Sequence, residues 1–392
     1  MSIQGRADNR EDGRIRLGMV GGGEGAFIGA VHRIAARIDD HYTLVAGALS
    51  SSPEKSLRSG AALGLDPART YPDFETMARE ESAREDGIEA VSIVTPNHMH
   101  TPAAEAFLNA GIHVICDKPL TTTLAEARRL REAAVRSGLV FAVTYNYTGY
   151  PMVRHAREMV QSGELGDIRV IQVEYPQDWL TENLEATGQK QAEWRTDPAR
   201  SGAGGCVGDI GTHAYNLQDF VAGVKVTEIC AELTAFVPGR KLDDNVQILL
   251  RYENGARGML WTSQVAPGNE NSLRLRVYGT KGGLEWAQEQ PNHLWYSPFG
   301  KPTQLLSRGT GGAGASAARV TRTPSGHPEG YLEGFATIYS EVAAAIRASR
   351  GKTERPAEVT FPTIDDGVKG VAFIEAAVVS SAMGAAWVKL GG

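Results

Sequence analysis

The chain has 392 residues, 42% of them hydrophobic and 22% charged, a length that predicts two domains and a composition typical of a globular protein. Its formal net charge is −6, and without a basic cluster it is poorly matched to a nucleic-acid backbone or an anionic membrane surface. The three cysteines, Cys116, Cys206 and Cys230, lack the number and spacing of a disulfide framework or a thiolate metal site, and so favour a reducing compartment.

Residues 1–16 mix arginine, acidic residues and glycine without the apolar stretch of a secretory signal. No apolar run elsewhere is long enough to cross a bilayer. We therefore expect a cytoplasmic protein with neither nucleic acid nor a membrane as its partner.

Residues 15–145 alternate short β-branched runs with amphipathic segments rich in alanine, arginine and glutamate. This alternation predicts an α/β fold, with a doubly wound parallel sheet and crossover helices. Helix ends are marked by Ser52 before Pro53, by Thr123 and Glu126 at capping-box spacing, and by Gly138. The predicted strands are 15–20, 43–49, 90–94, 113–116 and 139–144, and the first predicted helix is 30–38.

A glycine-rich loop, residues 21–29, separates the first predicted strand from the first helix. Glycine allows a sharp turn there and brings backbone N–H groups against a pyrophosphate at the helix amino terminus. Gly21 and Gly23 fit the dinucleotide-binding fingerprint, but Gly29 comes later than its third position requires. The alternative is an ordinary tight turn between a strand and a helix. The predicted cofactor ligands are Gly21, Gly23, Gly25, Phe27, Ile28 and Gly29.

The second predicted strand ends without the acidic residue that usually binds a ribose diol in such sites. Ser50 and Ser51 stand there instead, followed by Lys55, and serine hydroxyls also bond to a ribose. No arginine follows the strand directly. We therefore expect NAD as the cofactor, with NADP not excluded, and Ser50, Ser51 and Lys55 among its ligands.

Beyond residue 150 the pattern changes to a helix, 153–161, followed by strands joined through short turns. Asn254-Gly255 between two of these strands is a strong hairpin signal. We expect an α+β domain with a large, mainly antiparallel open sheet, so that the domains are 1–148 and 149–392. The predicted strands are 168–175, 227–237, 245–252, 256–265 and 273–278, and two closing helices are 329–348 and 365–388, which can pack back on the first domain.

Residues 307–326 consist mainly of glycine, alanine, serine, threonine and arginine. Such a composition buries little apolar surface, so we expect this segment to be mobile and able to act as a lid.

Asp209 and His213 are four residues apart in a predicted helix, 207–220, so that both side chains project from one face. A neutral histidine is well suited to accept an alcohol proton near neutral pH. An isolated pair of this kind is otherwise an acid near a helix start with a core histidine, or two metal ligands, although no third ligand is obvious. We expect no metal.

Together these motifs resemble the Gfo/Idh/MocA oxidoreductases, the glucose-fructose oxidoreductase and inositol dehydrogenase group. The resemblance covers almost the whole chain. Its motifs are the glycine-rich loop, Thr-Pro-Asn-His-Met-His at 95–100, Asp-Lys-Pro at 117–119, Trp-Arg at 194–195 and Gly-Asp-Ile-Gly-Thr-His at 208–213. The family usually has glutamate where this chain has Asp117, a shorter acid that leaves the role of Lys118 intact.

The resemblance implies the interconversion of a secondary alcohol and a ketone on a sugar or cyclitol, with hydride passing to or from nicotinamide. Lys118 would bind cofactor and substrate and lower the pKa of the base, Asp209 would orient the substrate hydroxyl, and His213 would take its proton. Other cofactor ligands on this basis are Thr95, Pro96, Asn97, His100, Asp117, Asn146, Trp194 and Arg195.

Several residues are weaker candidates for the substrate pocket, since polyhydroxylated ligands favour bidentate and aromatic partners. His327 follows the glycine-rich segment and either closes over a sugar or is a surface histidine. Arg195 binds cofactor or substrate, or makes a structural ion pair. Tyr147 and Trp179 complete this set.

We expect an NAD-dependent sugar or inositol dehydrogenase. One rival is a redox-neutral glycosidase or eliminase that uses the same site with tightly held NAD. Another is a non-catalytic nucleotide-binding sensor. The open sheet of the second domain exposes an apolar face, which predicts a homodimer or homotetramer.

Overall fold

The computed structural model describes residues 13–351 and 353–391, which form two compact units. Within them, the first unit runs to Leu120 and also contains Ala125–Gly149 and Tyr331–Gly367. The second contains Thr121–Leu124, Tyr150–Gly330 and the residues from Val368 onward. The chain therefore returns to the first unit late in the sequence. The division of functions at residue 148 stays a prediction.

The first unit is built on a five-stranded parallel sheet in the order β2-β1-β3-β4-β5. The direction of winding reverses between β1 and β3, so the loops after these strands leave the same edge at the point where ligands usually bind in such sheets. The predicted doubly wound parallel sheet is confirmed, with strand ends shifted by at most two residues. The strands are β1 (Ile15–Gly21), β2 (Tyr42–Ala48), β3 (Ala90–Val94), β4 (His113–Cys116) and β5 (Phe141–Val143).

Two of the helix ends predicted in this unit are confirmed, and the Thr123 and Glu126 capping box stays a prediction. The Ser52 hydroxyl accepts the Lys55 N–H at the start of α2, Pro53 is the first helical residue, and Gly138 has φ +65° after α5. The helices are α1 (Phe27–Ile38), α2 (Pro53–Ala62), η2 (Pro67–Arg69), α3 (Phe74–Ser82), η3 (Asn97–Met99), α4 (His100–Asn109), α5 (Leu124–Ser137), η4 (Asn146–Gly149) and α11 (Tyr331–Arg350).

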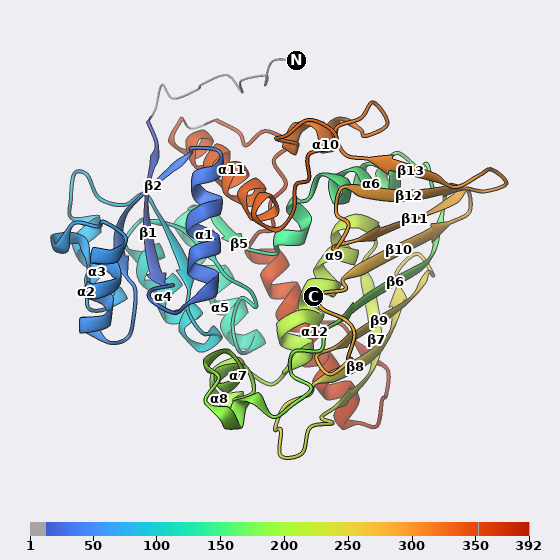
Figure 1. The fold of residues 1–392 in the computed structure, drawn as a ribbon, viewed down its shortest axis with the longest axis horizontal. Helices are drawn as coiled ribbons and strands as arrows, with labels where there is room; N and C mark the ends of the chain where they lie inside the picture. Colours follow the sequence, from blue (N-terminus) through green and yellow to red (C-terminus); the bar gives the residue numbers. More distant parts are fainter. Residues whose placement is uncertain (1–12, 352, 392) are drawn as a thin grey trace. The chain divides into compact units, whose positions relative to one another are not determined.

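Helix α11, from the last quarter of the chain, packs against α1 in the first unit (Figure 1). Its residues Phe335, Ile338 and Val342 share one buried cluster with Ile15 and Val31. The core of the first unit thus joins residues from both ends of the sequence, a long-range packing that no local pattern encodes.

The second unit is built on a nine-stranded sheet in the order β13-β12-β11-β10-β6-β9-β8-β7-β14. All its pairs are antiparallel except β6 with β9. The predicted hairpin is confirmed, because Gly255 has φ +86° between the paired strands β8 and β9. The strands are β6 (Ile168–Pro176), β7 (Val226–Thr234), β8 (Asn245–Tyr252), β9 (Arg257–Ser263), β10 (Arg274–Gly279), β11 (Gly282–Ala287), β12 (His293–Pro298), β13 (Gln304–Ser307) and β14 (Val388–Lys389).

Helices cover one face of this sheet, as Figure 1 shows. On β8 the inward residues Val246, Ile248 and Leu250 are buried, whereas Leu249 between them is half exposed. The large, mainly antiparallel open sheet predicted from the sequence is confirmed. The helices are α6 (Pro151–Gln161), η5 (Leu184–Thr187), α7 (Lys190–Arg195), α8 (Pro198–Ser201), a π-helical turn (Val207–Gly211), α9 (Thr212–Ala222), α10 (Ala315–Val320) and α12 (Ile364–Ala382).

The helical prediction for 207–220 is confirmed, although its first turn, Val207–Gly211, is π-helical and precedes α9. One local prediction needs correction. The segment 307–326 does bury apolar surface, since Ala317 and Val320 of α10 are 0% and 2% exposed. These side chains are buried because α10 packs against α6, a contact that composition does not reveal. In the described part of the chain, no helix combines the length and apolar character needed to span a membrane.

Candidate functional site

The glycine-rich loop leaves the end of β1, where Gly21 has φ +79° and Gly22 φ +70°. These values favour glycine, because L-residues with a side chain rarely adopt them. A Cβ on Gly23 would lie 2.6 Å from the Leu49 carbonyl oxygen and 2.7 Å from the Ser59 hydroxyl. The backbone of this loop is therefore held too close to the end of β2 for any side chain.

Gly29 takes the role of the third glycine despite its late position. It lies inside α1, which begins at Phe27 rather than at the predicted residue 30. A Cβ at Gly29 would overlap the backbone of Gly22, so only glycine lets the helix meet the loop. The amino terminus of α1 is thus brought directly against the loop, as an anion site at a helix start requires.

The turn after β2 carries the serines predicted to meet a ribose. The Ser50 hydroxyl accepts the Ser52 N–H at 3.2 Å, Ser51 is exposed, and Lys55 is half-buried in the first turn of α2. Ser50 therefore shapes the turn. Contact of Ser50, Ser51 and Lys55 with a cofactor stays a prediction.

His100 connects the loops that follow β3 and β4. Its ring is fully buried, with Nδ1 2.9 Å from the Pro119 carbonyl oxygen and Nε2 2.9 Å from the Thr95 carbonyl oxygen. Burial lowers the pKa of His100, and the hydrogen bonds to the two carbonyl groups oppose that shift. The side chain predicted to line a nicotinamide is thus placed where it holds two loops of the site together.

Lys118 follows β4 and is half-buried. The Asp117 carboxylate accepts the Lys118 N–H at 2.9 Å and the Thr144 hydroxyl at 2.8 Å. Asp117, which replaces the family's glutamate, therefore fixes the backbone of Lys118 to the end of β5. The peptide bond between Lys118 and Pro119 is cis.

Two buried polar atoms at the same edge of the sheet have no hydrogen-bond partner among the described residues. They are the hydroxyl of Thr95, directly after β3, and the side-chain nitrogen of Asn146, which is 1% exposed. Buried polar groups are normally paired, so these two suit a polar ligand that the chain itself does not supply. Together with the glycine-rich loop, they fit a dinucleotide. Asn97, two residues after Thr95, is also buried.

In the second unit, Asp209 lies in the π-helical turn and is held by two donors on one oxygen. The Gln264 side-chain nitrogen is 2.9 Å from Asp209 Oδ2, and Arg195 Nε is 3.3 Å from the same atom. Arg195 also stacks on the Trp194 ring at 4.3 Å and donates to the side chain of Gln191. The ion-pair alternative for Arg195 is therefore observed. Contact of Trp194 and Arg195 with cofactor or substrate stays a prediction.

His213 lies in the first turn of α9, is 8% exposed, and meets the Tyr175 ring edge-on at 6.5 Å between centroids. Asp209 precedes it by four residues across the change from π to α geometry. The two side chains belong to one short, continuous stretch of helical backbone, as the spacing predicted.

The sequence did not identify Gln264 or Gln191 as site residues. Gln264 directly follows β9, and a polar side chain at a strand end was the available signal. Neither glutamine belongs to a motif. Gln264 contacts Asp209, which is far away in the sequence, and Gln191 accepts a hydrogen bond from Arg195.

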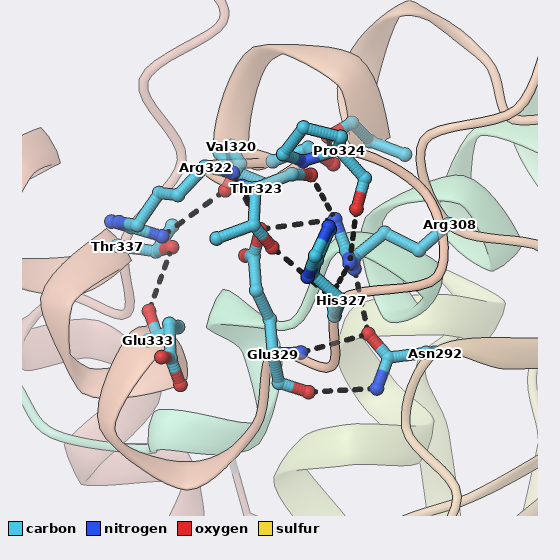
Figure 2. Close-up of polar contacts among 12 residues, drawn as sticks. Asn292, Arg308, Val320, Arg322, Thr323, Pro324, His327, Glu329, Glu333 and Thr337 are labelled. Atoms are coloured by element: carbon cyan, nitrogen blue, oxygen red, sulfur yellow. Dashed lines mark hydrogen bonds and ion pairs between the residues drawn. The ribbon is translucent and has the colours of Figure 1, made fainter. Parts of the chain in front are cut away.

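The segment 308–329 is fixed by a buried ion pair at its two ends, shown in Figure 2. Arg308 Nη1 lies 3.0 Å from Glu329 Oε1, and both side chains are at most 2% exposed. Arg308 also donates to the carbonyl oxygen of His327, whose residue is exposed. His327 thus contributes its backbone to this network. A role of its side chain, or of half-buried Trp179 and buried Tyr147, in substrate binding stays a prediction.

Metal ligands are not grouped in the part of the chain that the structure describes: no cluster of three or more His, Cys, Asp or Glu side chains that could hold an ion occurs there.

Comparison with protein families gives two matches. Residues 15–145 match an oxidoreductase family with an NAD-binding Rossmann fold, and residues 153–285 match the GFO/IDH/MocA C-terminal domain.

Three relatives that align over nearly the full length illustrate the family. An oxidoreductase from Sinorhizobium meliloti is 59% identical, with a TM-score of 0.88 over 96% of this chain and 99% of that chain. An inositol dehydrogenase homolog from Azotobacter vinelandii, complexed with NADH and myo-inositol, is 39% identical, with a TM-score of 0.91 over 96% and 97% of the two chains. Levoglucosan dehydrogenase of Pseudarthrobacter phenanthrenivorans is 26% identical over 95% of this chain and 97% of that protein.

Proposed function

Because this chain belongs to the Gfo/Idh/MocA family of oxidoreductases and carries an NAD-binding Rossmann domain, we propose that it interconverts a secondary alcohol and a ketone on a sugar or cyclitol. Inositol-like rings are the first substrates to test, since a relative of 39% identity is complexed with myo-inositol. A pyranose or anhydrosugar is the next class, given the levoglucosan dehydrogenase among its relatives.

The observation that carries the proposal is the Asp209 and His213 arrangement. Asp209 is an acceptor held by an arginine and an amide, and His213 follows it in the same helical stretch. A carboxylate fixed in this way can orient a hydroxyl group, and an imidazole beside it can accept the hydroxyl proton. A sensor that only binds a nucleotide needs neither group.

We propose distinct roles for three side chains. In the oxidising direction His213 accepts the hydroxyl proton, and it returns that proton in reduction. Asp209 accepts a hydrogen bond from the substrate and fixes its orientation. Lys118 contributes an ammonium group that binds cofactor and substrate. The nicotinamide, when bound, supplies the hydride acceptor or donor.

The cofactor would be held by the first unit. The glycine-rich loop and the start of α1 would bind the pyrophosphate, while Thr95 and Asn146 would supply their unpaired polar atoms to the nicotinamide half. Pro96, Asn97 and His100 would shape that half. Because Ser50 and Ser51 follow β2 without an adjacent arginine, NAD would be preferred over NADP.

We also propose that two or more copies associate through the open face of the nine-stranded sheet. Leu249, Met259, Trp295 and Leu305 are each 45–50% exposed on its strands. Such a surface is unfavourable in water, and a second copy of the sheet is the simplest cover for it. Analytical ultracentrifugation of wild type and Met259→Lys tests this: the variant should be monomeric, and an unchanged oligomer would contradict the proposal.

The activity itself is tested with a panel of inositols, pyranoses and anhydrosugars, each with NAD and with NADP. Reduced nicotinamide should accumulate with at least one cyclitol or sugar, faster with NAD. A chromogenic glycoside cleaved without accumulation of NADH would instead favour the redox-neutral rival. Binding of NADH without turnover of either class would favour the sensor.

The catalytic roles are tested with His213→Ala and Lys118→Ala. Removing the base should lower kcat about 10²- to 10⁴-fold, with a much smaller loss in NADH affinity measured by fluorescence titration. Lys118→Ala should lower both kcat and the affinity for NADH. Full turnover by His213→Ala would show that another group takes the proton.

A further inference from the structure

Gln264 occupies a rigid position directly after β9. Its residue is 3% exposed. Its N–H donates to the Asp244 carbonyl oxygen at 2.8 Å, and its own carbonyl oxygen accepts the Leu180 N–H at 3.0 Å. Both backbone groups are therefore fixed by other segments of the second unit. A side chain that starts from such a backbone has little freedom to move.

The amide of Gln264 is directed at Asp209. Its nitrogen lies 2.9 Å from Asp209 Oδ2, the same atom that pairs with Arg195 Nε at 3.3 Å. An amide nitrogen can only donate, so Asp209 Oδ2 must accept. A hydrogen bond from a neutral donor to a carboxylate is among the stronger ones in proteins, and its loss leaves the carboxylate less well oriented.

The two donors differ in what they add to the site. Arg195 brings a charge and stands on a short helix, α7, where its side chain is 25% exposed and stacks on Trp194. Gln264 brings no charge and is buried. It can therefore fix the direction of the carboxylate without adding a positive charge that would disfavour a protonated imidazole at His213.

We propose that Gln264 is a positioning residue, which fixes the Asp209 carboxylate in the orientation that the substrate hydroxyl requires. This inference rests on the proposed alcohol–ketone interconversion, in which Asp209 contacts the substrate. Gln264 itself acts through Asp209.

The test compares Gln264→Leu with Gln264→Glu in the full-length protein. Gln264→Leu keeps the size of the side chain and removes the donor, so kcat for the best polyol of the panel should fall roughly 10- to 100-fold. KM for NAD should stay within about twofold, because the cofactor ligands lie elsewhere.

Gln264→Glu gives a pH signature that a structural role would not produce. The introduced carboxyl faces Asp209 Oδ2, and two carboxylates at this distance resist joint ionisation, so one pKa rises. Arg195 also faces this oxygen and opposes that rise. When protonated, the new group donates an O–H in place of the amide. The ratio of variant to wild-type kcat should therefore rise as pH falls through that pKa, whereas the ratio for Gln264→Leu should stay flat.

Gln218→Leu is the matched control. Gln218 is fully buried in α9, and its side-chain oxygen accepts the Tyr252 hydroxyl. The substitution removes a buried amide of the same unit that makes no contact with Asp209. It should lower stability but leave kcat within about threefold of wild type.

Crystal structures of wild type and Gln264→Leu separate this inference from the proposed function. Wild-type kinetics in Gln264→Leu, in a protein that does oxidise polyols, would overturn the positioning role alone. If no polyol or sugar is oxidised, the positioning role is judged from the orientation of Asp209 in the crystal structures. A rotated carboxylate in Gln264→Leu would support the role, and an unchanged carboxylate would overturn it.

Discussion

Two segments of this protein that contain several glycines are fixed by different means. In residues 21–29 the glycines themselves are required, because side chains on Gly23 and Gly29 would collide with neighbouring backbone. In residues 307–326 the requirement differs between positions, since a Cβ at Gly311 would meet nothing within 4 Å and one at Gly314 would meet the Glu158 carboxylate. Charged side chains also hold this segment. Glycine content alone therefore does not distinguish a ligand cradle from a loop.

The second segment is held at three points. The Arg308–Glu329 pair joins its ends, and Glu329 also accepts the N–H groups of Arg322 and Thr323. On α6, His155 Nδ1 accepts the Gly314 N–H at 3.1 Å, and Glu158 accepts the Ser316 N–H at 3.0 Å in the first turn of α10. The structure of this segment therefore depends on the buried charged side chains next to it, which its composition does not reveal.

The largest effect should come from breaking that buried pair. Arg308→Met leaves Glu329 buried without its cation, which should lower the free energy of unfolding by about 3–5 kcal/mol. Chemical denaturation measures this. Arg136→Met is the control, because Arg136 and Glu132 are 70% and 67% exposed and should contribute at most about 0.5 kcal/mol. Equal losses in the two variants would show that the buried pair does not hold the segment.

The helix after the first segment should respond to acid. His32 of α1 is fully buried against Ser92 and Tyr339, and burial lowers its pKa to about 4, with Asp117 opposing and Arg33 adding to the shift. The folded state then binds fewer protons than the unfolded state between pH 6.5 and 4. The stability that this shift contributes is fully present above about pH 6.5 and is lost as the pH falls towards 4.

His32 should account for roughly 3 kcal/mol of this loss. Denaturation of wild type and His32→Gln at several pH values measures it. The variant should be less stable at pH 7 but should lose less stability on acidification. An identical pH slope in both proteins would rule out His32 as the titrating group.

A smaller loss of stability should follow from Gly29→Ala, which forces α1 away from Gly22. We expect a loss of roughly 1–3 kcal/mol in stability and at least about a tenfold loss in NADH affinity, since the helix start moves from the pyrophosphate. Calorimetric titration with NADH measures the affinity. Wild-type affinity in Gly29→Ala would mean that the late glycine is not part of the cofactor cradle.

The smallest effect should come from Gly311→Ala in the second segment. The added methyl group meets open space, and alanine restricts the unfolded chain more than glycine does. Stability should be unchanged or higher by up to about 1 kcal/mol, and NADH affinity should not change. A destabilisation as large as that of Gly29→Ala would remove the distinction between the two segments.

Prediction from the sequence succeeded where structure follows from short-range pattern. The five strands of the parallel sheet, the Ser52 cap and the Asn254-Gly255 hairpin were all identified, because each depends on a few adjacent residues. Strands β11, β12 and β13 were missed. β11 begins with two glycines, β12 ends in proline and β13 has only four residues, and the three become strands through pairing with β10 and with each other. The closing helix predicted at 365–388 ends at Ala382, and residues 388–389 form the short strand β14 instead.

The residues of the candidate site also fall into those that a local motif identifies and those that it does not. Lys118, Asp209 and His213 were identified from motifs, and their catalytic roles stay predictions. Gln264 was not identified, because its contact with Asp209 joins residues from two distant segments.

The sequence by itself determined the order of elements, the family and the residue types available for cofactor binding and proton transfer, since periodicity and motif spacing are local properties. Only the tertiary structure decided which donors converge on Asp209, which charges hold residues 308–329, and why a late Gly29 still completes the loop. Those outcomes depend on side chains that are far apart in the chain and become neighbours only when the sheets and helices pack.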